Sequence, residues 1–152
     1  MRQIILAAGC FWSVQFKLSK LEGVVSTQAV YAGGNKPEAS YEQVCSGGTG
    51  HAEGVLVTYD ESVLSLKELL LFFFMIHDAT QLNRQGPDIG EQYRSGVFYS
   101  DETQRNVATA LIDELQQQPR YSGKKITTVV EPMAMYNAAE EYHQNYYRKK
   151  GF

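Results

Sequence analysis

The sequence RQIILAAGCFWSVQFKLSKLEGVVSTQAVY, residues 2–31, decides the fold that we expect for this chain. Residues 2–8 contain the apolar run Ile4-Ile5-Leu6-Ala7-Ala8, which is typical of a strand buried on both faces. Residues 10–20 repeat apolar side chains at helical spacing, and Gly23 behind them is suited to end a helix. Residues 24–31 are rich in β-branched side chains. The stretch therefore predicts a strand, a helix and a second strand.

The order of the remaining elements separates two classes of fold. Residues 51–59 predict a third strand, and the Gly-rich loop before it contains only a short helical turn at residues 41–44. The later patterns predict a helix, a strand, a helix, a strand and a helical tail, at residues 66–76, 95–99, 101–118, 127–131 and from Ala138 onward. Because no crossover helix joins the second and third strands, the order favours an α+β fold with a ferredoxin-like split βαβ core over a doubly wound parallel sheet.

Length and composition limit the class of protein. The chain has 152 residues, of which 43% are hydrophobic, so we expect a single domain over residues 1–152. The net charge is −3 without a long basic run, which argues against binding to nucleic acid or an anionic membrane. The longest apolar run, residues 69–76, is far shorter than the roughly 20 residues of a bilayer span. No secretory signal precedes the first strand, so we expect a cytoplasmic protein with free thiols.

Cys10 is the first candidate for chemistry. It follows the predicted strand and Gly9, and it opens the predicted helix, where unpaired backbone N–H groups favour an anion. This position predicts a lowered thiol pKa and a better nucleophile. Phe11 and Trp12 follow directly. Trp12 lies off the apolar stripe of the helix, so it either lines a pocket or packs against the fold.

Glu53 and two tyrosines are candidates to assist this nucleophile. Glu53 shares a strand face with Val55 and Val57. Its carboxyl group therefore either points into the core with a raised pKa, as a general acid requires, or reaches water at the strand end. Tyr41 and Tyr93 lie in Gly-rich loops, where a phenol can donate a hydrogen bond to a polarised oxygen. The chain has 10 tyrosines, so packing is the alternative for each of them.

Other motifs give weaker evidence for a phosphate site, a metal site or a hydrolase. The glycines of residues 47–50 are not followed by the Lys and Ser or Thr of a phosphate-binding loop. The cysteines and histidines do not show the spacing of a metal site, so we expect no bound metal. A cysteine hydrolase remains open, because any of the three histidines could fold beside Cys10.

Six motifs resemble those of one enzyme family. They are Gly-Cys-Phe-Trp (9–12), Tyr-Glu-Gln-Val-Cys-Ser-Gly (41–47), Thr-Gly-His-Ala-Glu (49–53), Gln-Leu-Asn-Arg-Gln-Gly-Pro-Asp (81–88), Gln-Tyr-Arg-Ser (92–95) and Glu-Tyr-His-Gln (141–144). In this order they are similar to the A-type peptide methionine sulfoxide reductases over nearly the whole chain. That enzyme class reverses the oxidation of methionine. The resemblance implies a two-layer α/β sandwich around a ferredoxin-like core.

The resemblance also implies thiol-dependent reduction of methionine S-sulfoxide, free or in proteins, and hence repair of oxidised proteins. Cys10 would attack the sulfoxide sulfur, release methionine and be left as a cysteine sulfenic acid. Glu53 would protonate the sulfoxide oxygen, and Tyr41 and Tyr93 would donate hydrogen bonds to it. A module that binds oxidised methionine without turnover is the alternative.

The same resemblance assigns the remaining contacts of the substrate. Phe11 and Trp12 would hold the S-methyl group, and Asp88 would be a polar anchor. Ser13 stands where the family usually has Gly, and we expect it to be tolerated in a first helical turn.

Recycling of the thiol is the step at which the sequence departs from many members of the family. They carry a resolving cysteine in a C-terminal tail, whereas this sequence ends at Phe152 and has Cys45 as its only other cysteine. Cys45 could take part in recycling only if it can reach Cys10, but we expect it to be buried and inert. The reductant would then be an external thiol such as thioredoxin, glutaredoxin or glutathione, with no bound cofactor. We expect a monomer whose partners are this reductant and the sulfoxide substrate.

Overall fold

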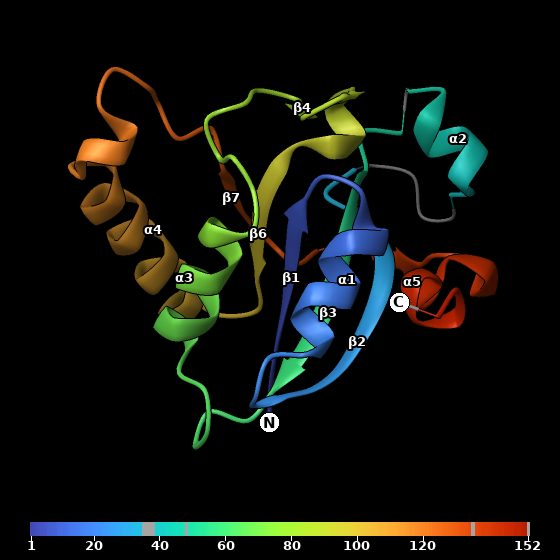
Figure 1. Ribbon diagram of the computed structural model, residues 1–152, viewed down its shortest axis with the longest axis horizontal. Helices are drawn as coiled ribbons and strands as arrows, with labels where there is room; N and C mark the ends of the chain where they lie inside the picture. The colour runs from blue at the N-terminus through green and yellow to red at the C-terminus, as the bar shows by residue number, and fades with distance from the viewer. Residues whose placement is uncertain (35–38, 48, 135, 152) are drawn as a thin grey trace.

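The computed structural model describes residues 1–34, 39–47, 49–134 and 136–151 (Figure 1). Part of the predicted Gly-rich loop, residues 35–38 and 48, lies outside the described residues. The elements are β1 (Arg2–Ala8), α1 (Phe11–Ser19), β2 (Val24–Ala32), α2 (Tyr41–Cys45), β3 (Ala52–Tyr59), α3 (Leu66–Met75), β4 (Arg84–Gln85), β5 (Asp88–Ile89), β6 (Ser95–Tyr99), α4 (Glu102–Gln116), β7 (Val129–Pro132), β8 (Tyr136–Ala138) and α5 (Tyr146–Lys149), with single 3-10 turns at Glu91–Tyr93, Pro119–Tyr121 and Glu141–His143. Among these described elements, no helix is long and apolar enough to cross a membrane.

The main sheet has the strand order β7-β6-β1-β3-β2-β8. β1 pairs antiparallel with β3 on one side and with β6 on the other, and β3 pairs antiparallel with β2. β1 and β2 are therefore parallel, with β3 inserted between them, which is the predicted split βαβ arrangement. β7 adds in parallel to β6, and β8 adds antiparallel to β2. The predicted α+β class is confirmed.

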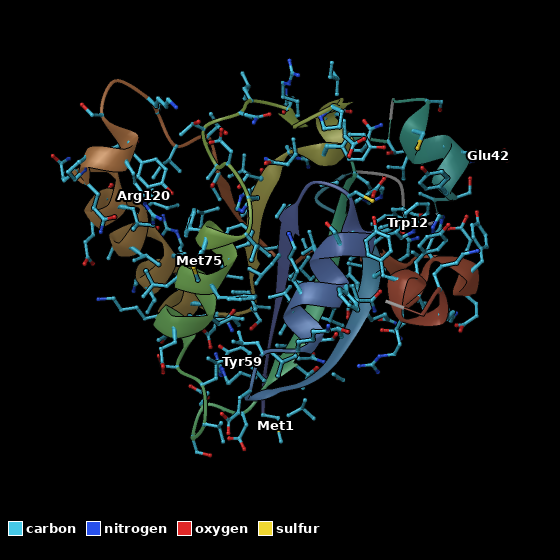
Figure 2. All side chains as sticks on the ribbon, viewed as in Figure 1. Met1, Trp12, Glu42, Tyr59, Met75 and Arg120 are labelled. Carbon is cyan, nitrogen blue, oxygen red and sulfur yellow. The ribbon has the colours of Figure 1, made fainter. Side chains whose placement is uncertain are left out.

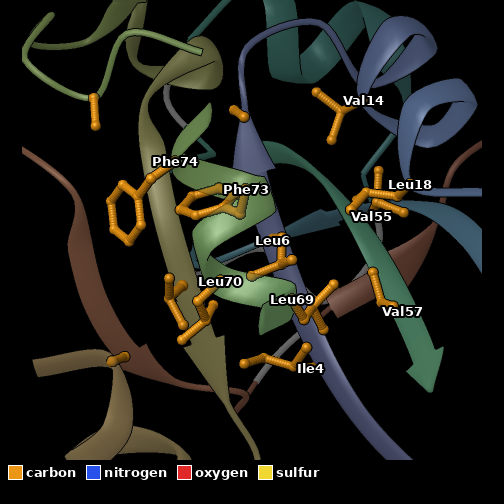
Figure 3. Close-up of a cluster of buried hydrophobic side chains, with 14 of the residues drawn as sticks. Ile4, Leu6, Val14, Leu18, Val55, Val57, Leu69, Leu70, Phe73 and Phe74 are labelled. Atoms are coloured by element: carbon orange, nitrogen blue, oxygen red, sulfur yellow. The ribbon is translucent and has the colours of Figure 1, made fainter. Parts of the chain in front are cut away.

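One face of the sheet carries the main core. Alternate residues of β1, β2 and β3 point to this face and pack against α1, α3 and α4. Figure 3 shows Ile4 and Leu6 of β1 beside Leu69, Leu70 and Phe73 of α3. Residues of the opposite parity form a smaller cluster on the other face. The sheet and these three helices make the two layers of the predicted sandwich (Figure 1).

Phe73 provides a test of this core. It is 0% exposed in α3, and its ring centroid lies 4.9 Å from that of Phe74. We expect Phe73→Ala to lower the free energy of unfolding by about 3–5 kcal/mol, because the change leaves a cavity among packed side chains. Urea denaturation would measure the loss. Met75→Ala on the same helix, where the side chain is 66% exposed, is the control. A loss as small as the control's, about 0.5 kcal/mol or less, would contradict the placement of Phe73 in the core.

The C-terminal region differs from the helix predicted to begin at Ala138. β8 ends at Ala138, a single turn covers Glu141–His143, and α5 begins only at Tyr146. The reason is that this segment bonds to the edge of the sheet. The side chain of Gln144 accepts from the backbone N–H of Ala29 at 2.8 Å and donates to its C=O at 2.9 Å. The backbone N–H of Ala139 also donates to the C=O of Ala29, at 2.9 Å, so the segment is held along β2 and does not continue as a helix.

β7 begins at Val129, two residues later than the predicted strand at Thr127. The backbone N–H of Thr127 donates to the C=O of Ala79 at 2.8 Å. Thr127 is therefore bonded to the loop after α3 and does not extend the sheet.

Candidate active site

Cys10 lies where β1 turns into α1. β1 ends at Ala8, and Gly9 has φ +94°, a left-handed conformation that favours glycine. A Cβ at Gly9 would also lie 2.8 Å from the Cβ of Gln85. The chain then enters α1 at Phe11, with Cys10 as the half-buried residue that precedes the helix. This is the position predicted for the nucleophile.

The environment of the Cys10 thiol differs from the predicted one. Burial raises the pKa of the thiol to about 11. Hydrogen bonds from the backbone N–H groups of Trp12 and Ser13 lower this pKa, but the negative charges of Glu53 and Asp88 raise it again. The prediction of a lowered pKa is therefore wrong, because removal from water outweighs the effect of the helix N-terminus. The thiol needs help to lose its proton.

Glu53 is buried beside the start of α1. Its side chain is 1% exposed, and its Oε1 accepts a hydrogen bond from the backbone N–H of Phe11 at 3.2 Å. Its Oε2 is buried and has no hydrogen-bond partner among the described residues. Burial raises the pKa of the carboxyl group to about 7, the bond from Phe11 lowers it and the charge of Asp88 raises it. Of the two predicted placements the buried one is correct, and the carboxyl group can donate a proton near neutral pH.

Asp88 and Tyr93 lie near both groups. Asp88 begins β5, and its negative charge raises the pKa of Cys10 and of Glu53. Tyr93 ends the single turn Glu91–Tyr93. Burial raises the pKa of Tyr93 to about 12, and the charges of Glu53, Asp88 and Cys10 raise it as well. These mutual effects indicate that one thiol, two carboxyl groups and a phenol share one site.

Tyr41 and Cys45 occupy the two ends of α2. Burial raises the pKa of Tyr41, as do a side-chain hydrogen bond with Cys45 and the charges of Cys45, Tyr93 and Glu53. Tyr41 thus joins the same site. Cys45 is exposed, so the prediction of a buried cysteine is wrong. The physical reason is that α2, capped by Ser40, is a single short turn whose last residue stays at the surface.

Phe11 and Trp12 follow Cys10 but have different surroundings. Phe11 is 1% exposed, and its ring centroid lies 5.7 Å from that of Tyr31. Trp12 is half-buried and stacks on Tyr146 of α5, with ring centroids 3.8 Å apart. Figure 2 shows Trp12 on the side of α1 that faces the C-terminal segment. All seven residues predicted for the site therefore lie in or next to the region around Cys10.

The residues that brace this site were missed by the reasoning from sequence patterns. The Nε1–H of Trp12 donates to Nδ1 of His143 at 2.9 Å. The carboxylate of Glu140 accepts from the hydroxyl of Tyr31 at 2.7 Å and from the backbone N–H of Tyr41 at 3.0 Å. Both bracing residues lie in the segment for which periodicity predicts a helix. The Glu-Tyr-His-Gln motif (141–144) was a signal that could have found His143, but it does not include Glu140.

Each histidine has a partner other than the thiol. The Nδ1 of His51 accepts from a backbone N–H at 3.1 Å, and His77 lies between a backbone C=O and the hydroxyl of Ser95 at 2.7 and 2.8 Å. The Nδ1 of His143 accepts from Trp12. This arrangement argues against the cysteine hydrolase that the sequence leaves open. Within the described ranges, no group of three or more His, Cys, Asp or Glu side chains could hold a metal ion.

Comparison with known proteins points to one family. The family described as Peptide methionine sulfoxide reductase matches residues 2–151. Peptide methionine sulfoxide reductase MsrA of Clostridium botulinum is 51% identical over 149 residues, which cover 98% of this chain and 93% of the relative. The structure of methionine sulfoxide reductase A of Corynebacterium diphtheriae is similar with a TM-score of 0.93 and 33% identity, covering 97% of this chain and 74% of that one. Mxr1 from Saccharomyces cerevisiae in complex with Trx2 is similar with a TM-score of 0.67 and 28% identity, covering 95% and 84%.

Proposed function

Because this chain belongs to the peptide methionine sulfoxide reductase family, whose members are oxidoreductases, we propose that it reduces methionine S-sulfoxide, free or in proteins, with Cys10 as the nucleophile. The observation that carries the proposal is the buried carboxyl group of Glu53. Its Oε2 lacks a partner among the described residues, and its pKa is raised to about 7. Such a group is suited to protonate a sulfoxide oxygen near neutral pH. We propose that the matched region, residues 2–151, is one domain.

The first half of the proposed reaction transfers the sulfoxide oxygen to Cys10. The Cys10 thiolate attacks the sulfoxide sulfur while Glu53 gives its proton to the oxygen. The attack forms a bond between the two sulfur atoms. The bond between the substrate sulfur and oxygen then breaks as the oxygen passes to Cys10, and the sulfur–sulfur bond breaks with its electron pair left on the methionine sulfur. Methionine leaves as the reduced product, and Cys10 is oxidised to a sulfenic acid. The proton lost by the thiol restores Glu53, so thiol and sulfoxide give sulfenic acid and thioether without a further reactant.

A protonated Glu53 favours both formation of the Cys10 thiolate and protonation of the sulfoxide oxygen. The charge of the Glu53 carboxylate raises the pKa of Cys10, so a neutral Glu53 makes the thiol easier to ionise. Tyr41 and Tyr93 both have raised pKa values and keep their protons. They are therefore suited to donate hydrogen bonds to the oxygen as its negative charge grows.

Phe11 and Trp12 are proposed to contact the S-methyl group, and Asp88 to anchor a polar part of the substrate. The half-buried indole of Trp12 offers an apolar surface one helical turn or less from Cys10. Ser13, the departure from the family pattern, directs its hydroxyl to the C=O of Cys10 at 3.5 Å. This hydroxyl is bonded to the helix backbone, which supports the expectation that Ser13 is tolerated.

The second half of the proposed reaction consumes two external thiols. One thiol attacks the sulfenic acid, and water leaves as a mixed disulfide forms with Cys10. A second thiol then reduces that disulfide and regenerates Cys10. Thioredoxin supplies both thiols in our proposal, and the complex of the related Mxr1 with Trx2 supports this choice. Glutaredoxin and glutathione are the alternative donors.

An assay with the two epimers of methionine sulfoxide, each with thioredoxin, glutaredoxin or glutathione, tests the proposal. We expect methionine from the S epimer only, with one thiol pair oxidised per turnover, because separate enzymes act on the two epimers. Binding of the S epimer without turnover would favour the recognition module. An acyl adduct on Cys10 without thiol consumption would favour the hydrolase.

A further inference from the structure

His143 lies between two sides of the proposed active site. It ends the single turn Glu141–His143 and is 1% exposed. The centroid of its ring lies 5.7 Å from that of Trp12 and 4.5 Å from that of Tyr41. The ring of Phe11 is 5.3 Å away. One side chain thus contacts the residues proposed to bind the methyl group and one of the phenols proposed to bind the oxygen.

The hydrogen bond between Trp12 and His143 has only one possible direction. The indole Nε1–H is a donor and lies 2.9 Å from Nδ1 of His143. Nδ1 is therefore the unprotonated nitrogen, and the neutral ring carries its proton on Nε2. Burial lowers the pKa of His143, although the charge of Glu140 raises it, so the neutral form is favoured. Nε2 is buried without a partner among the described residues, which leaves the Trp12 bond as the one that orients this ring.

The backbone on both sides of His143 is fixed to the fold. Gln144 bonds through its side chain to the backbone N–H and C=O of one residue of β2, at 2.8 and 2.9 Å. Glu140 accepts from the hydroxyl of Tyr31, also in β2, and from the backbone N–H of Tyr41 at the start of α2. His143 is thereby held in place relative to both β2 and α2. It offers Trp12 a fixed acceptor.

We propose that His143 is a positioning residue, whose Nδ1 holds the indole of Trp12 while its ring packs against Tyr41, so that the methyl-binding and oxygen-binding groups keep a fixed separation. This inference rests on the proposed function, in which Trp12 contacts the S-methyl group. An indole without this bond would spend only part of its time in the binding orientation, and apparent affinity falls with that fraction. The methyl contact exists in the bound substrate and the transition state alike, so its loss should raise KM and leave kcat nearly unchanged.

A buried histidine with a purely structural role would behave differently. Its loss would reduce the fraction of folded enzyme, which lowers the apparent kcat and leaves KM unchanged. Two substitutions separate these roles. His143→Leu fills much of the space but removes the acceptor, whereas His143→Asn keeps an oxygen acceptor near the position of Nδ1.

Steady-state kinetics and Trp12 fluorescence together test the proposal. Trp12 is the single tryptophan of the sequence, so fluorescence anisotropy decay reports this indole alone. For His143→Leu we expect KM for methionine S-sulfoxide to rise about tenfold, with kcat changed less than about twofold and a faster anisotropy decay. His143→Asn should recover most of both properties. In the Trp12→Phe background, which lacks the indole N–H, His143→Leu should add little further effect on KM.

Unchanged KM and unchanged anisotropy decay in folded His143→Leu would overturn the proposal. Equal defects in the Leu and Asn variants would also overturn it, because the acceptor would then have no role. Failure of the proposed function is a separate result: the wild-type protein would not reduce the S epimer. In that case the anisotropy decay would still decide whether His143 holds Trp12.

Discussion

Cys10→Ser should lower the rate of methionine S-sulfoxide reduction by more than about 10⁴-fold. Serine nearly keeps the size of the side chain, but its hydroxyl is a far weaker nucleophile than a thiol and cannot hold the oxygen as a sulfenic acid. The burial that already raises the pKa of the thiol to about 11 would oppose ionisation of the hydroxyl still more. The measurement is methionine formed from the S epimer with thioredoxin as reductant. Retention of most activity would remove Cys10 from its proposed role.

Cys45→Ser is the matched control for the Cys10 variant. Cys45 is exposed, and a serine hydroxyl can keep the side-chain hydrogen bond with Tyr41. With an external thiol as reductant, we expect this variant to keep most of its activity. Mass spectrometry of the wild-type protein after one turnover without reductant should show sulfenic acid on Cys10. A Cys10–Cys45 disulfide would contradict recycling by an external thiol alone and make Cys45 a resolving cysteine.

The parts of the fold that the sequence predicts correctly are those set by local patterns. The alternation in β3 places Glu53 on the same face as Val55 and Val57, and the structure confirms this placement. The helix α3 begins behind Ser65 because Ser65 and Glu68 form a capping box. The C-terminal segment was mispredicted because its structure depends on bonds to β2, more than 100 positions away in the chain. Periodicity within a short window carries no information on such bonds.

Local sequence patterns likewise predict one part of the candidate site and not the other. The turn from strand to helix locates Cys10 from sequence alone. The alternation in the third strand leaves two placements open for the Glu53 carboxyl group, one in the core and one in water at the strand end. The raised pKa of Cys10 could not be predicted, because it follows from burial and from the charges of Glu53 and Asp88, which come from other elements. The bond from Trp12 to His143 joins residues 131 positions apart. The electrostatics of the site and the contacts that brace it therefore required the folded structure, whereas the position of the proposed nucleophile did not.

Glu53→Gln should slow the reaction by about 10² to 10⁴, the usual contribution of a general acid. The amide oxygen of glutamine can accept the hydrogen bond from Phe11 as Oε1 of Glu53 does, so the start of α1 should be preserved. An amide cannot, however, give up a proton to the sulfoxide oxygen. The measurement is kcat/KM for the S epimer near neutral pH. A rate close to that of the wild type would show that Glu53 is not the acid.

The pH dependence of the two proteins provides a second readout. In the wild type, kcat/KM should fall as the pH rises above about 7, because Glu53 loses the proton that it donates. The new negative charge also raises the pKa of Cys10 and opposes formation of the thiolate. Glu53→Gln should lack this fall, and its low rate should increase with pH as the thiol ionises. The same alkaline fall in both proteins would assign it to another group.

The carboxyl group of Glu53 should also lower the stability of the fold at alkaline pH. Its pKa rises from the ordinary 4.5 to about 7 on folding, so between these values the folded protein binds more protons than the unfolded chain. The stability contributed by the protonated group is complete below about pH 4.5 and is lost as the pH rises through about 7. Urea denaturation should therefore find Glu53→Gln more stable than the wild type at about pH 8, by a margin that shrinks toward about pH 4. An equal margin at both pH values would contradict the raised pKa. A variant that is more stable and nearly inactive would show that this buried carboxyl group serves the chemistry at the expense of folding.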